Sequence, residues 1–417
     1  MTDRDIQRRI AIVSFGYGWL PCEPGPSRFY DIAQQFVQAG WNVDFIISGF
    51  QHFNKAPRDR ELIESQGYPF EVTIIDVPPY RKNVDVRRIY SNRIGSRRVV
   101  SYLKTQRYDA VYCSIPANDI AAAVGEWCHR EGIPFIVDIE DLWPEAMEML
   151  DIVPPLTGPV YGYFQHDAER VYRVADAVVG TSEDYTARAM RNNGRLIPAM
   201  TVYVGCNLVE FDEGSARHAG RIMKPAGEFW VTYAGSIGTS YDIETLVRSA
   251  AVLRDCETRD IRVKILGDGP LRPELENLAS ELGCDNVEFL GYRDYDEMAA
   301  YLVASDLLVN SFVSAAPQSF VNKVGDYLAA GKPIVNTLEN PVFQSFVHEQ
   351  GVGVNIEPGN VAALAGAIIA YQDNPEQRDV IGRRARLVCE AHFDRRATYP
   401  RIVSFVEGIV KGHEARS

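Results

Sequence analysis

One stretch of the chain combines side chains that together could bind a nucleotide diphosphate. The sequence PQSFVNKVGDYLAAGKP, residues 317–333, contains Gln318, Asn322, Lys323 and Asp326. A lysine near the start of a helix can neutralise phosphate oxygens, and a carboxylate one turn further along can accept hydrogen bonds from vicinal ribose hydroxyls. The competing interpretation is a simple ion pair, because Lys323 and Asp326 are neighbours on the surface of the predicted helix.

The residues on either side predict the elements that hold this stretch in place. Apolar runs at Asp306–Phe312 and Pro333–Thr337 have the length and aliphatic content of buried strands. A helix is expected between them, with Ser319 as its candidate N-cap and Gly331 at its end. In a strand–loop–helix–strand unit, the start of the helix lies at the carboxyl edge of a parallel sheet, where such folds bind ligands.

Two glycine-rich turns follow strands in the same half of the chain. The loop Gly235-Ser236-Ile237-Gly238-Thr239 comes after the predicted strand Phe229–Ala234, and its small residues would let a diphosphate approach closely. It lacks the lysine of a P-loop, which weighs against ATP hydrolysis. The second turn, Gly267-Asp268-Gly269-Pro270, is either a ligand contact or only a tight turn.

In the first half of the chain, two segments could bind a second ligand. The loop GYGWLPCEPGPSR, residues 16–28, follows a predicted strand but is not G-x-G-x-x-G, and Ser48 stands where an NAD-binding acid would. Its last residue, Arg28, opposes the dipole of the helix that it opens, which is unfavourable unless it serves a ligand or a neighbouring carboxylate. The segment DIEDLWPE, residues 138–145, has four acids beside Trp143, which suits sugar hydroxyls and acid–base chemistry; helix capping is the alternative.

The composition is that of a soluble globular protein large enough for two or three domains. The chain has 417 residues, of which 46% are hydrophobic and 24% charged, and its net charge of -13 argues against wholesale nucleic-acid binding. One region departs from this balance and could attract anionic lipid, phosphate or an acidic partner, unless it is only a solvated helix face. Its basic residues, set against the single acid Asp85, are Arg81, Lys82, Arg87, Arg88, Arg93, Arg97, Arg98, Lys104 and Arg107.

The cysteines and the apolar runs indicate a cellular location. The seven cysteines are dispersed without a CxxC pair, which predicts reduced thiols in a cytoplasmic protein. We find neither a signal-peptide core nor a run of about 18 apolar residues, so we expect any membrane contact to be peripheral, at the inner face of the cell membrane through residues 81–107.

Strand and helix signals alternate along both halves of the chain. This rhythm predicts an α/β fold of two doubly wound, Rossmann-like domains with a ligand cleft between them. We expect residues 1–204 to form the first domain, 205–395 the second, and 396–417 a helix that packs back on the first. The polar segment Gly205–Glu228 is expected to be the linker.

Taken together, these residues resemble the family-4-type retaining glycosyltransferases of the GT-B fold, and most of all the bacterial branch that builds O-antigen and capsule polysaccharides. The resemblance covers nearly the whole chain. The segments that carry it are the Gly/Pro loop ending in Arg28, Ser114-Ile115-Pro116, DIEDLWPE, ADAVVGTSEDY (175–185), GCNLVEF (205–211), YAGSIG (233–238), ILGDGP (265–270), VEFLGY (287–292) and DYLAAGKPIV (326–335).

The resemblance implies a retaining, hexosyltransferase-type enzyme of cell-surface polysaccharide or glycolipid biosynthesis. Such an enzyme moves a sugar from a nucleotide sugar, here a UDP- or GDP-sugar, to a hydroxyl of an acceptor sugar or lipid-linked glycan, without a metal or other cofactor. The catalytic candidates are then Gln318, Lys323 and Asp141. The donor-binding candidates are Gly235, Ser236, Gly238, Thr239, Gly267, Tyr292, Arg293, Ser319, Phe320, Asn322 and Asp326. The acceptor-binding candidates are Gly18, Arg28, Trp143 and Glu145.

The chain departs from the family pattern at three places, one of which is the absence of the histidine that many members carry where Ser114-Ile115-Pro116 lies here. The family's two glutamates, eight residues apart, are replaced by Gln318 and Asp326, and the loop at 235–239 lacks the usual Arg and Lys. Asp326 can still bind ribose hydroxyls, Gln318 can still bind a sugar hydroxyl without carrying charge, and Lys323 is left as the best cation, with Arg293 as a second. These departures leave two alternatives: a catalytically silent protein that binds a nucleotide sugar or a partner, and a nucleotide-sugar epimerase on the same fold.

Overall fold

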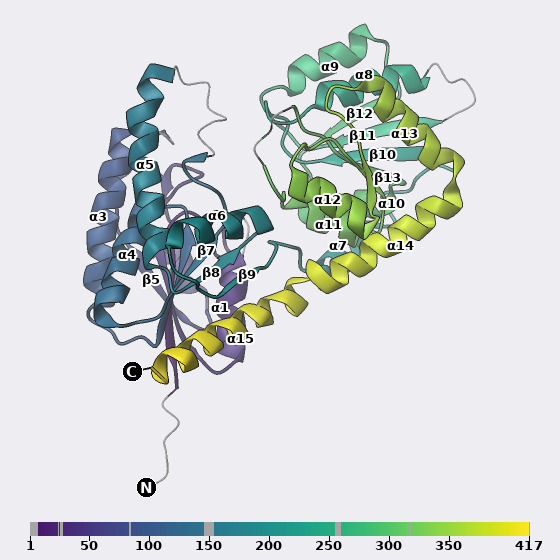
Figure 1. Ribbon diagram of the computed structural model, residues 1–417. Coiled ribbons are helices and arrows are strands. Elements are labelled where there is room, and N and C mark those ends of the chain that lie inside the picture. The colour runs from purple at the N-terminus through teal and green to yellow at the C-terminus, as the bar shows by residue number, and fades with distance from the viewer. Residues whose placement is uncertain are drawn as a thin grey trace. The chain divides into compact units, whose positions relative to one another are not determined.

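The structure is a computed structural model that describes residues 7–23, 25, 28–82, 85–145, 154–254, 260–314, 316 and 318–416. The chain divides into two compact units, each of which is built around a parallel sheet (Figure 1). Unit 1 consists of Met1–Tyr203 and Thr398–Ser417, and unit 2 consists of Val204–Ala397.

Unit 1 contains a seven-stranded parallel sheet in the order β5-β2-β1-β6-β7-β8-β9 and a small antiparallel ribbon, β3-β4. From β1 the chain first extends the sheet to one side through β2 and β5, and then to the other side from β6 to β9. This is the doubly wound arrangement. The elements are β1 (Arg9–Ser14), α1 (Arg28–Gln38), β2 (Asn42–Ser48), β3 (Phe50–Gln51), β4 (Ala56–Pro57), α2 (Arg60–Ser65), β5 (Glu71–Ile75), α3 (Val86–Leu103), β6 (Ala110–Ile115), α4 (Asn118–Glu131), β7 (Phe135–Ile139), α5 (Pro154–Val174), β8 (Ala177–Gly180), α6 (Glu183–Asn193), β9 (Ala199–Thr201) and α15 (Arg395–Glu414), most of which lies in this unit.

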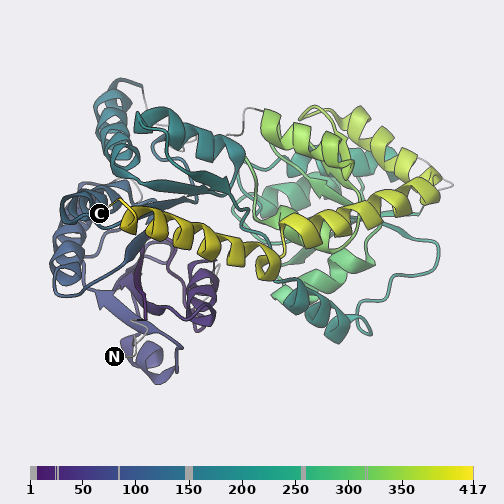
Figure 2. The ribbon, with the colours of Figure 1, turned by 60° about the horizontal axis from the view of Figure 1, so that its bottom comes forward.

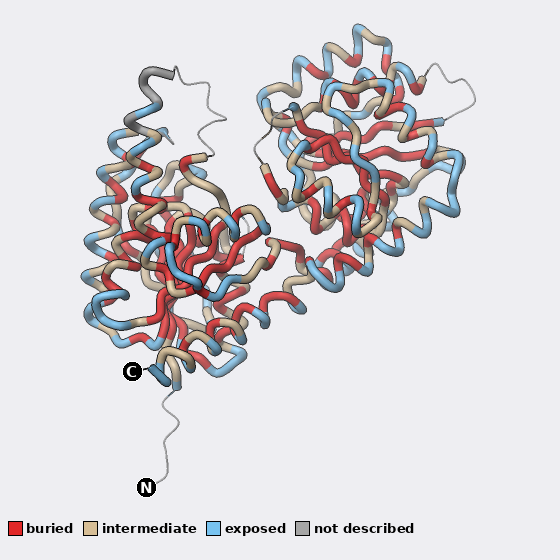
Figure 3. Tube along the Cα trace, in the orientation of Figure 1, coloured by how far each residue is buried: buried red, intermediate tan, exposed pale blue. Residues whose placement is uncertain are grey.

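Helices cover both faces of this sheet, so its strands are apolar on both sides (Figure 3). In β1, Ile10 and Ile12 join the core beneath α1 and α15, whereas Ala11 and Val13 join the core beneath α3, α4 and α5. This period-2 alternation explains why the strands read as continuous apolar runs in the sequence. Figure 2 shows α15 lying along unit 1, where the side chain of Ile402 and its neighbours enter the same core as α1.

Unit 2 repeats the arrangement with a six-stranded parallel sheet in the order β12-β11-β10-β13-β14-β15. Both sheets confirm the predicted α/β, doubly wound fold, and in each the strand order reverses beside its first strand, between β1 and β6 and between β10 and β13. The elements are α7 (Leu208–His218), β10 (Phe229–Ala234), α8 (Ile243–Arg254), β11 (Ile261–Leu266), α9 (Arg272–Glu281), β12 (Val287–Gly291), α10 (Tyr295–Ala304), β13 (Leu307–Asn310), α11 (Lys323–Ala329), β14 (Ile334–Asn336), α12 (Pro341–Gln350), β15 (Gly353–Asn355), α13 (Val361–Asp373) and α14 (Pro375–His392).

Two local predictions were wrong. Residues 208–218 of the expected linker form α7, because Asn207 caps its first turn and Phe211 packs against Tyr295 with ring centroids 6.3 Å apart. The helix expected to begin near Ser319 begins at Lys323 instead, after a turn in which the ring of Phe320 is held by other aromatic side chains.

A buried ion pair ties α1 to the end of β7 in unit 1. The guanidinium of Arg28 donates from Nε and Nη2 to the two carboxylate oxygens of Asp138, at 3.1 Å each, and its Nη1 donates to the carbonyl of Val202 at 3.0 Å. Nε also lies 2.7 Å from the carboxylate of Glu140. Arg28 is 1% exposed and Asp138 is 0% exposed. The expectation that Arg28 serves a neighbouring carboxylate is therefore the one that the structure supports.

Removing this cation should destabilise unit 1 strongly. We expect Arg28→Met to lower the free energy of unfolding by about 3–5 kcal/mol, because Asp138 would stay buried without its counter-charge. Arg8→Met, which removes the more exposed pair with Glu414 in the same unit, should cost at most about 1 kcal/mol. Urea denaturation of both variants measures the difference, and equal small losses would contradict the central role of the buried pair.

Candidate functional site

The ammonium group of Lys323 lies in a cage of aromatic rings at the carboxyl edge of the unit 2 sheet. Its Nζ is 4.2 Å from the ring centroid of Tyr233, 4.5 Å from that of Tyr241 and 5.2 Å from that of Phe312. Tyr233 belongs to β10 and Phe312 follows β13, so the cage marks the point where the strand order reverses. Such reversal points are where doubly wound sheets bind their ligands.

Lys323 is buried in this cage without a counter-charge. Among the described residues Nζ has no hydrogen-bond partner, and burial lowers the pKa of the ammonium to about 7. The ion pair with Asp326, the competing interpretation of the sequence, is therefore not formed. A buried cationic group without an acceptor is costly, and an anion that reached it would relieve that cost.

The two glycine-rich turns pack against each other above this lysine. A Cβ atom at Gly235 would lie 3.2 Å from the Nζ of Lys323, and one at Gly267 would lie 1.8 Å from the carbonyl oxygen of Gly235. The N–H of Ile237 donates to the carbonyl of Asp268 at 2.9 Å. The glycine at 267 is thus required for close packing of the turns, whereas the glycine at 235 keeps the approach to Lys323 open.

Asp326 lies one turn along α11 from Lys323 and is held by α10. The hydroxyl of Tyr295 donates to its Oδ1 at 2.7 Å. Burial raises the pKa of Asp326 to about 6, although the Tyr295 hydrogen bond and the charge of Arg395 act in the opposite direction. At neutral pH this carboxylate is mostly ionised, and its other oxygen can accept a further hydrogen bond.

The other predicted donor-binding residues lie on loops of the same unit. Gln318 is half-buried on the loop after β13, Ser319 beside it is buried, and Asn322 is exposed just before α11. Tyr292, 80% exposed, and Arg293, 3.6 Å from Glu297, follow β12.

Three of the predicted donor-binding residues have groups that are already engaged within the protein or face elsewhere. The ring of Phe320 packs against Phe343 and Phe346 at centroid distances of 5.0 and 5.1 Å, so its side chain serves the core. The carbonyl of Ser236 already accepts a hydrogen bond from the hydroxyl of Tyr233. Thr239 lines a hollow between α8 and α9, whereas a Cβ at Gly238 would meet open space.

Unit 1 contains a cavity of about 170 Å³ at the carboxyl edge of its own sheet. It lies beside the ends of β1, β2, β6 and β7, and the first turns of α3 form one wall. Aromatic rings dominate the lining, with a few polar side chains among them, as in small-molecule sites. The lining residues are Phe15, Gly16, Tyr17, Ser48, Phe50, His52, Phe53, Val77, Tyr80, Arg88, Ser91, Asn92, Pro116, Ala117, Asp141 and Trp143.

The DIEDLWPE segment divides between this cavity and the core. Asp141 and Trp143 line the cavity, and burial, with the charge of Glu145, raises the pKa of Asp141 to about 6. Glu145 itself accepts from Arg188 at 2.5 Å, an ion pair within unit 1. Of the four acids, only Asp141 therefore offers its carboxylate to the cavity.

Two predicted acceptor-binding residues have structural roles instead. Arg28 is committed to the buried ion pair with Asp138, so its guanidinium does not reach the cavity. At Gly18 a Cβ atom would lie 2.3 Å from the carbonyl oxygen of Ser14, so this glycine is needed for close packing of the loop on β1. These assignments correct the sequence-based prediction of acceptor contacts at both positions.

Sequence reasoning missed the residues that complete both sites. In unit 2 these are the cage tyrosines and Tyr295, which lie far from Lys323 and Asp326 in sequence. In unit 1 they are Arg88, Ser91 and Asn92. A signal for Arg88 was present, since it falls on the helical stripe of residues 88, 92, 95, 99 and 103, all of which are buried.

We expect Tyr295→Phe to raise the pKa of Asp326 further above 6, because the lost hydroxyl stabilises the ionised carboxylate. Carboxyl-carbon NMR titration of Asp326 measures the change. Tyr301→Phe, on the same helix but stacked on Trp230, should leave that pKa unchanged. An unchanged or lower value in Tyr295→Phe would contradict the assigned hydrogen bond.

None of the helices in the described part of the chain combines the length and the apolar composition that a membrane span requires. Within the same residues, no group of three or more His, Cys, Asp or Glu side chains is arranged to hold a metal ion. Metal independence stays a prediction.

Two protein families match the chain, one in each of its two units. Residues 26–205 match the glycosyl transferase 4-like domain, and residues 217–388 match the glycosyl transferases group 1 family. WcaI of Escherichia coli strain K12, whose name assigns it to glycosyl transfer in colanic acid biosynthesis, is 28% identical over 181 residues. That alignment spans 43% of this chain and 43% of WcaI, less than half of either protein.

Solved structures share the fold along nearly the whole chain. HepE of Anabaena in complex with UDP has a TM-score of 0.70 at 15% identity, covering 96% of this chain and 100% of HepE. Sucrose-phosphate synthase of Thermosynechococcus elongatus has a TM-score of 0.73 at 18% identity, covering 97% and 100%. These likenesses and the two doubly wound sheets show the GT-B fold, and the two family matches, which together cover most of the chain, assign it to the glycosyltransferases.

Proposed function

We propose that the protein transfers a sugar from a nucleotide-diphosphate sugar to an acceptor hydroxyl, with retention at the anomeric carbon, in cell-surface polysaccharide or glycolipid biosynthesis. The observation that carries the proposal is the buried ammonium of Lys323, which lacks an acceptor and lies where a doubly wound sheet binds its ligand. A diphosphate supplies the missing negative charge. UDP is the favoured nucleotide, since structures of HepE contain UDP and UDP-glucose.

The leaving diphosphate gains negative charge as the bond to the sugar breaks. A cation that is already fixed in a water-poor cage stabilises this charge without reorganising. Lys323 has this role, and Asp326 accepts hydrogen bonds from the ribose hydroxyls while Tyr295 orients it. Gln318 hydrogen-bonds a hydroxyl of the donor sugar.

The acceptor binds in the unit 1 cavity with its reacting hydroxyl directed to Asp141. At neutral pH this carboxylate is mostly ionised and accepts a hydrogen bond that orients the hydroxyl. As the new glycosidic bond forms, the hydroxyl proton passes to the departing phosphate oxygen, on the same face of the sugar. No metal or other cofactor enters this scheme.

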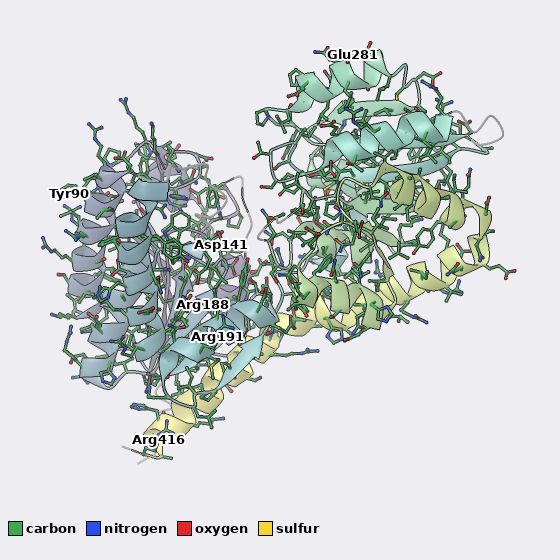
Figure 4. The ribbon with its side chains drawn as sticks, turned by 45° about the horizontal axis from the view of Figure 1, so that its top comes forward. Tyr90, Asp141, Arg188, Arg191, Glu281 and Arg416 are labelled. Carbon is green, nitrogen blue, oxygen red and sulfur yellow. The ribbon has the colours of Figure 1, made fainter. Side chains whose placement is uncertain are left out.

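A membrane-surface location is part of the proposal. On α3 the side chains of Arg87, Arg93 and Arg97 are exposed, as is that of Val86. Tyr90 on the same helix is also exposed (Figure 4). Cations interleaved with apolar side chains suit an anionic lipid surface, which would bring the enzyme to a lipid-linked acceptor. Absence of cosedimentation with anionic vesicles would refute this contact.

Transfer itself is the direct test. Purified protein incubated with UDP-sugars and a panel of glycan acceptors should form a product whose anomeric configuration, read from the proton NMR coupling constant, equals that of the donor. Donor binding without transfer or hydrolysis would favour the silent alternative. Conversion of the donor sugar without an acceptor would favour the epimerase.

Binding of UDP-glucose should depend on pH in a bell shape. Affinity should weaken below about pH 6, as Asp326 is protonated, and above about pH 7, as Lys323 loses the proton that the diphosphate needs. UDP-glucose suits the measurement because each of its two phosphorus atoms carries one ester bond and the shared anhydride bond, so neither phosphate has a pKa in this range. Isothermal titration calorimetry from pH 5 to 9 gives the profile, and a flat profile above pH 7 would contradict the phosphate contact.

Lys323→Met should remove the alkaline limb of that profile and weaken UDP-glucose about 10- to 100-fold, the range for a lost charge-assisted hydrogen bond. Uridine, which has no phosphate, should bind this variant as it binds the wild type. Lys264→Met is the control, since Lys264 also lies over an aromatic ring, that of Trp230, but is paired with Glu288.

A further inference from the structure

One serine of α3 lines the unit 1 cavity with a hydroxyl that has no partner among the described residues. Ser91 is 1% exposed, and its Oγ forms no hydrogen bond with any of them. A serine inside a helix often donates to the carbonyl of the residue four positions earlier. Ser96 on the same helix does so, donating to the carbonyl of Asn92 at 2.8 Å. Because buried polar groups are nearly always paired, the hydroxyl of Ser91 is available to a group in the cavity.

The indole N–H of Trp143 is a second unpaired donor in the same lining. Its Nε1 is buried and has no hydrogen-bond partner in the described part of the chain. Other contacts fix the ring, which packs edge-on against Phe164 with centroids 5.6 Å apart and has the guanidinium of Arg88 5.3 Å from its centroid. The carbonyl of Trp143 accepts a hydrogen bond from the side-chain amide of Asn118 at 2.6 Å. The direction of the indole N–H is therefore set by the fold.

Several other polar side chains of the lining are already paired. Nδ1 of His52 and the hydroxyl of Tyr80 share a hydrogen bond of 2.6 Å. The side-chain amide of Asn92 donates to the carboxylate of Asp119 at 3.0 Å. The unpaired donors of α3 and of the loop after β7 therefore differ from these neighbours in the same lining.

The charges around the cavity offset one another. Burial lowers the pKa of Arg88, whereas Tyr80 and the charge of the buried Asp119 act in the opposite direction, so this arginine already has an acidic neighbour. Burial, followed by the charges of Arg88 and Lys55, lowers the pKa of His52 to about 3, so its ring is neutral. The lining therefore requires no charge from a ligand, and a neutral group that accepts hydrogen bonds satisfies it.

The size and the remaining lining limit the ligand further. A volume of about 170 Å³ lies below the roughly 300–1,000 Å³ of pockets that enclose drug-sized ligands. The cavity therefore encloses one substituent and the adjoining part of a sugar ring rather than an oligosaccharide. Much of its surface is apolar, and Phe50, Val77 and Ala117 are among the residues that provide this surface.

An acetamido group combines the properties that this lining requires. Its carbonyl oxygen has two lone pairs and no proton, so it can accept from two donors. A sugar hydroxyl can also accept, but its own proton then needs a further acceptor in an apolar cavity. The methyl group of an acetamido substituent suits the apolar part of the lining. The amide N–H lies on the opposite side of the trans amide from the carbonyl oxygen and so does not compete for the two donors.

We infer, on the basis of the proposed function, that the acceptor is an N-acetylated amino sugar whose acetamido carbonyl is bound by Ser91 and Trp143 in the unit 1 cavity. The acetamido group orients the ring, and a hydroxyl of that ring is directed to Asp141. Ser91 and Trp143 thus select the acceptor, and the substrate class is an N-acetyl hexosamine or a glycan that ends in one.

Binding of four soluble sugars to the full chain, measured by ligand-observed NMR at millimolar concentration, tests the inference. N-acetylglucosamine and N-acetylgalactosamine carry the acetamido group, and glucose and galactose are their counterparts without it. At least one of the two N-acetyl sugars should bind at least about 10-fold more tightly than its counterpart, as expected for two added hydrogen bonds. Which of them binds better identifies the configuration of the ring.

Two variants assign this preference to the unpaired donors. Ser91→Ala and Trp143→Phe each remove one donor and should weaken the preferred N-acetyl sugar about 3- to 10-fold, with little effect on its counterpart. Because neither donor has a partner among the described residues, neither change breaks a side-chain hydrogen bond there. Thermal unfolding of both variants should confirm a native Tm.

The chain offers a matched control for each variant. Ser14→Ala and Trp127→Phe also remove a buried donor that has no partner within the described ranges, but neither residue lines the cavity. Neither control should change the affinity for any of the four sugars.

Equal binding of the N-acetyl sugars and their counterparts, or binding of none of the four, would overturn the inference. So would a preference for the acetamido group that persists unchanged in both Ser91→Ala and Trp143→Phe. These outcomes are distinguishable from failure of the proposed function, since UDP-glucose titration reports on Lys323 in unit 2 and does not depend on the unit 1 cavity.

Discussion

The buried ion pair between Arg28 and Asp138 is the interaction on which the unit 1 site depends. A strand that is covered on both faces excludes charge, yet Asp138, the last residue but one of β7, is a carboxylate that is 0% exposed. The guanidinium at the start of α1 compensates it and, through the carbonyl of Val202, also holds the segment after β9. Asp141 and Trp143 follow β7 within five residues, so the cavity wall takes its position from this pair.

Unit 2 contains one buried cation that has no hydrogen-bond partner among the residues that the structure describes. It is Lys323 in its aromatic cage. A buried charge of this kind destabilises the fold. It lies at the carboxyl edge of the sheet, where it does not interrupt the hydrogen bonds between strands. A chain with a net charge of -13 can thus attract an anionic substrate through one buried charge, because a low dielectric magnifies its effect.

The sequence allowed the fold to be predicted well, because apolar runs, caps and glycine turns are local signals. Gly331, with φ of +65°, ends α11 as its type and position predicted. The prediction of a linker at residues 205–228 failed because α7 is stabilised by its contact with α10, which lies far from it in the sequence. The same limit applies to the sites: Lys323 and Asp141 were predicted as site residues from local spacing, whereas the side chains that set their environments belong to other elements.

Arg28 and Arg88 illustrate why residue type alone could not assign roles. Both are arginines in the first turn of a helix, and both were candidates for an anion. Arg28 meets a carboxylate of its own unit, so its charge is spent within the fold. Arg88 instead lines the cavity and lies over the ring of Trp143. The two arginines differ in the partners that the fold brings to them, and those partners come from elements far apart in the sequence rather than from any short motif.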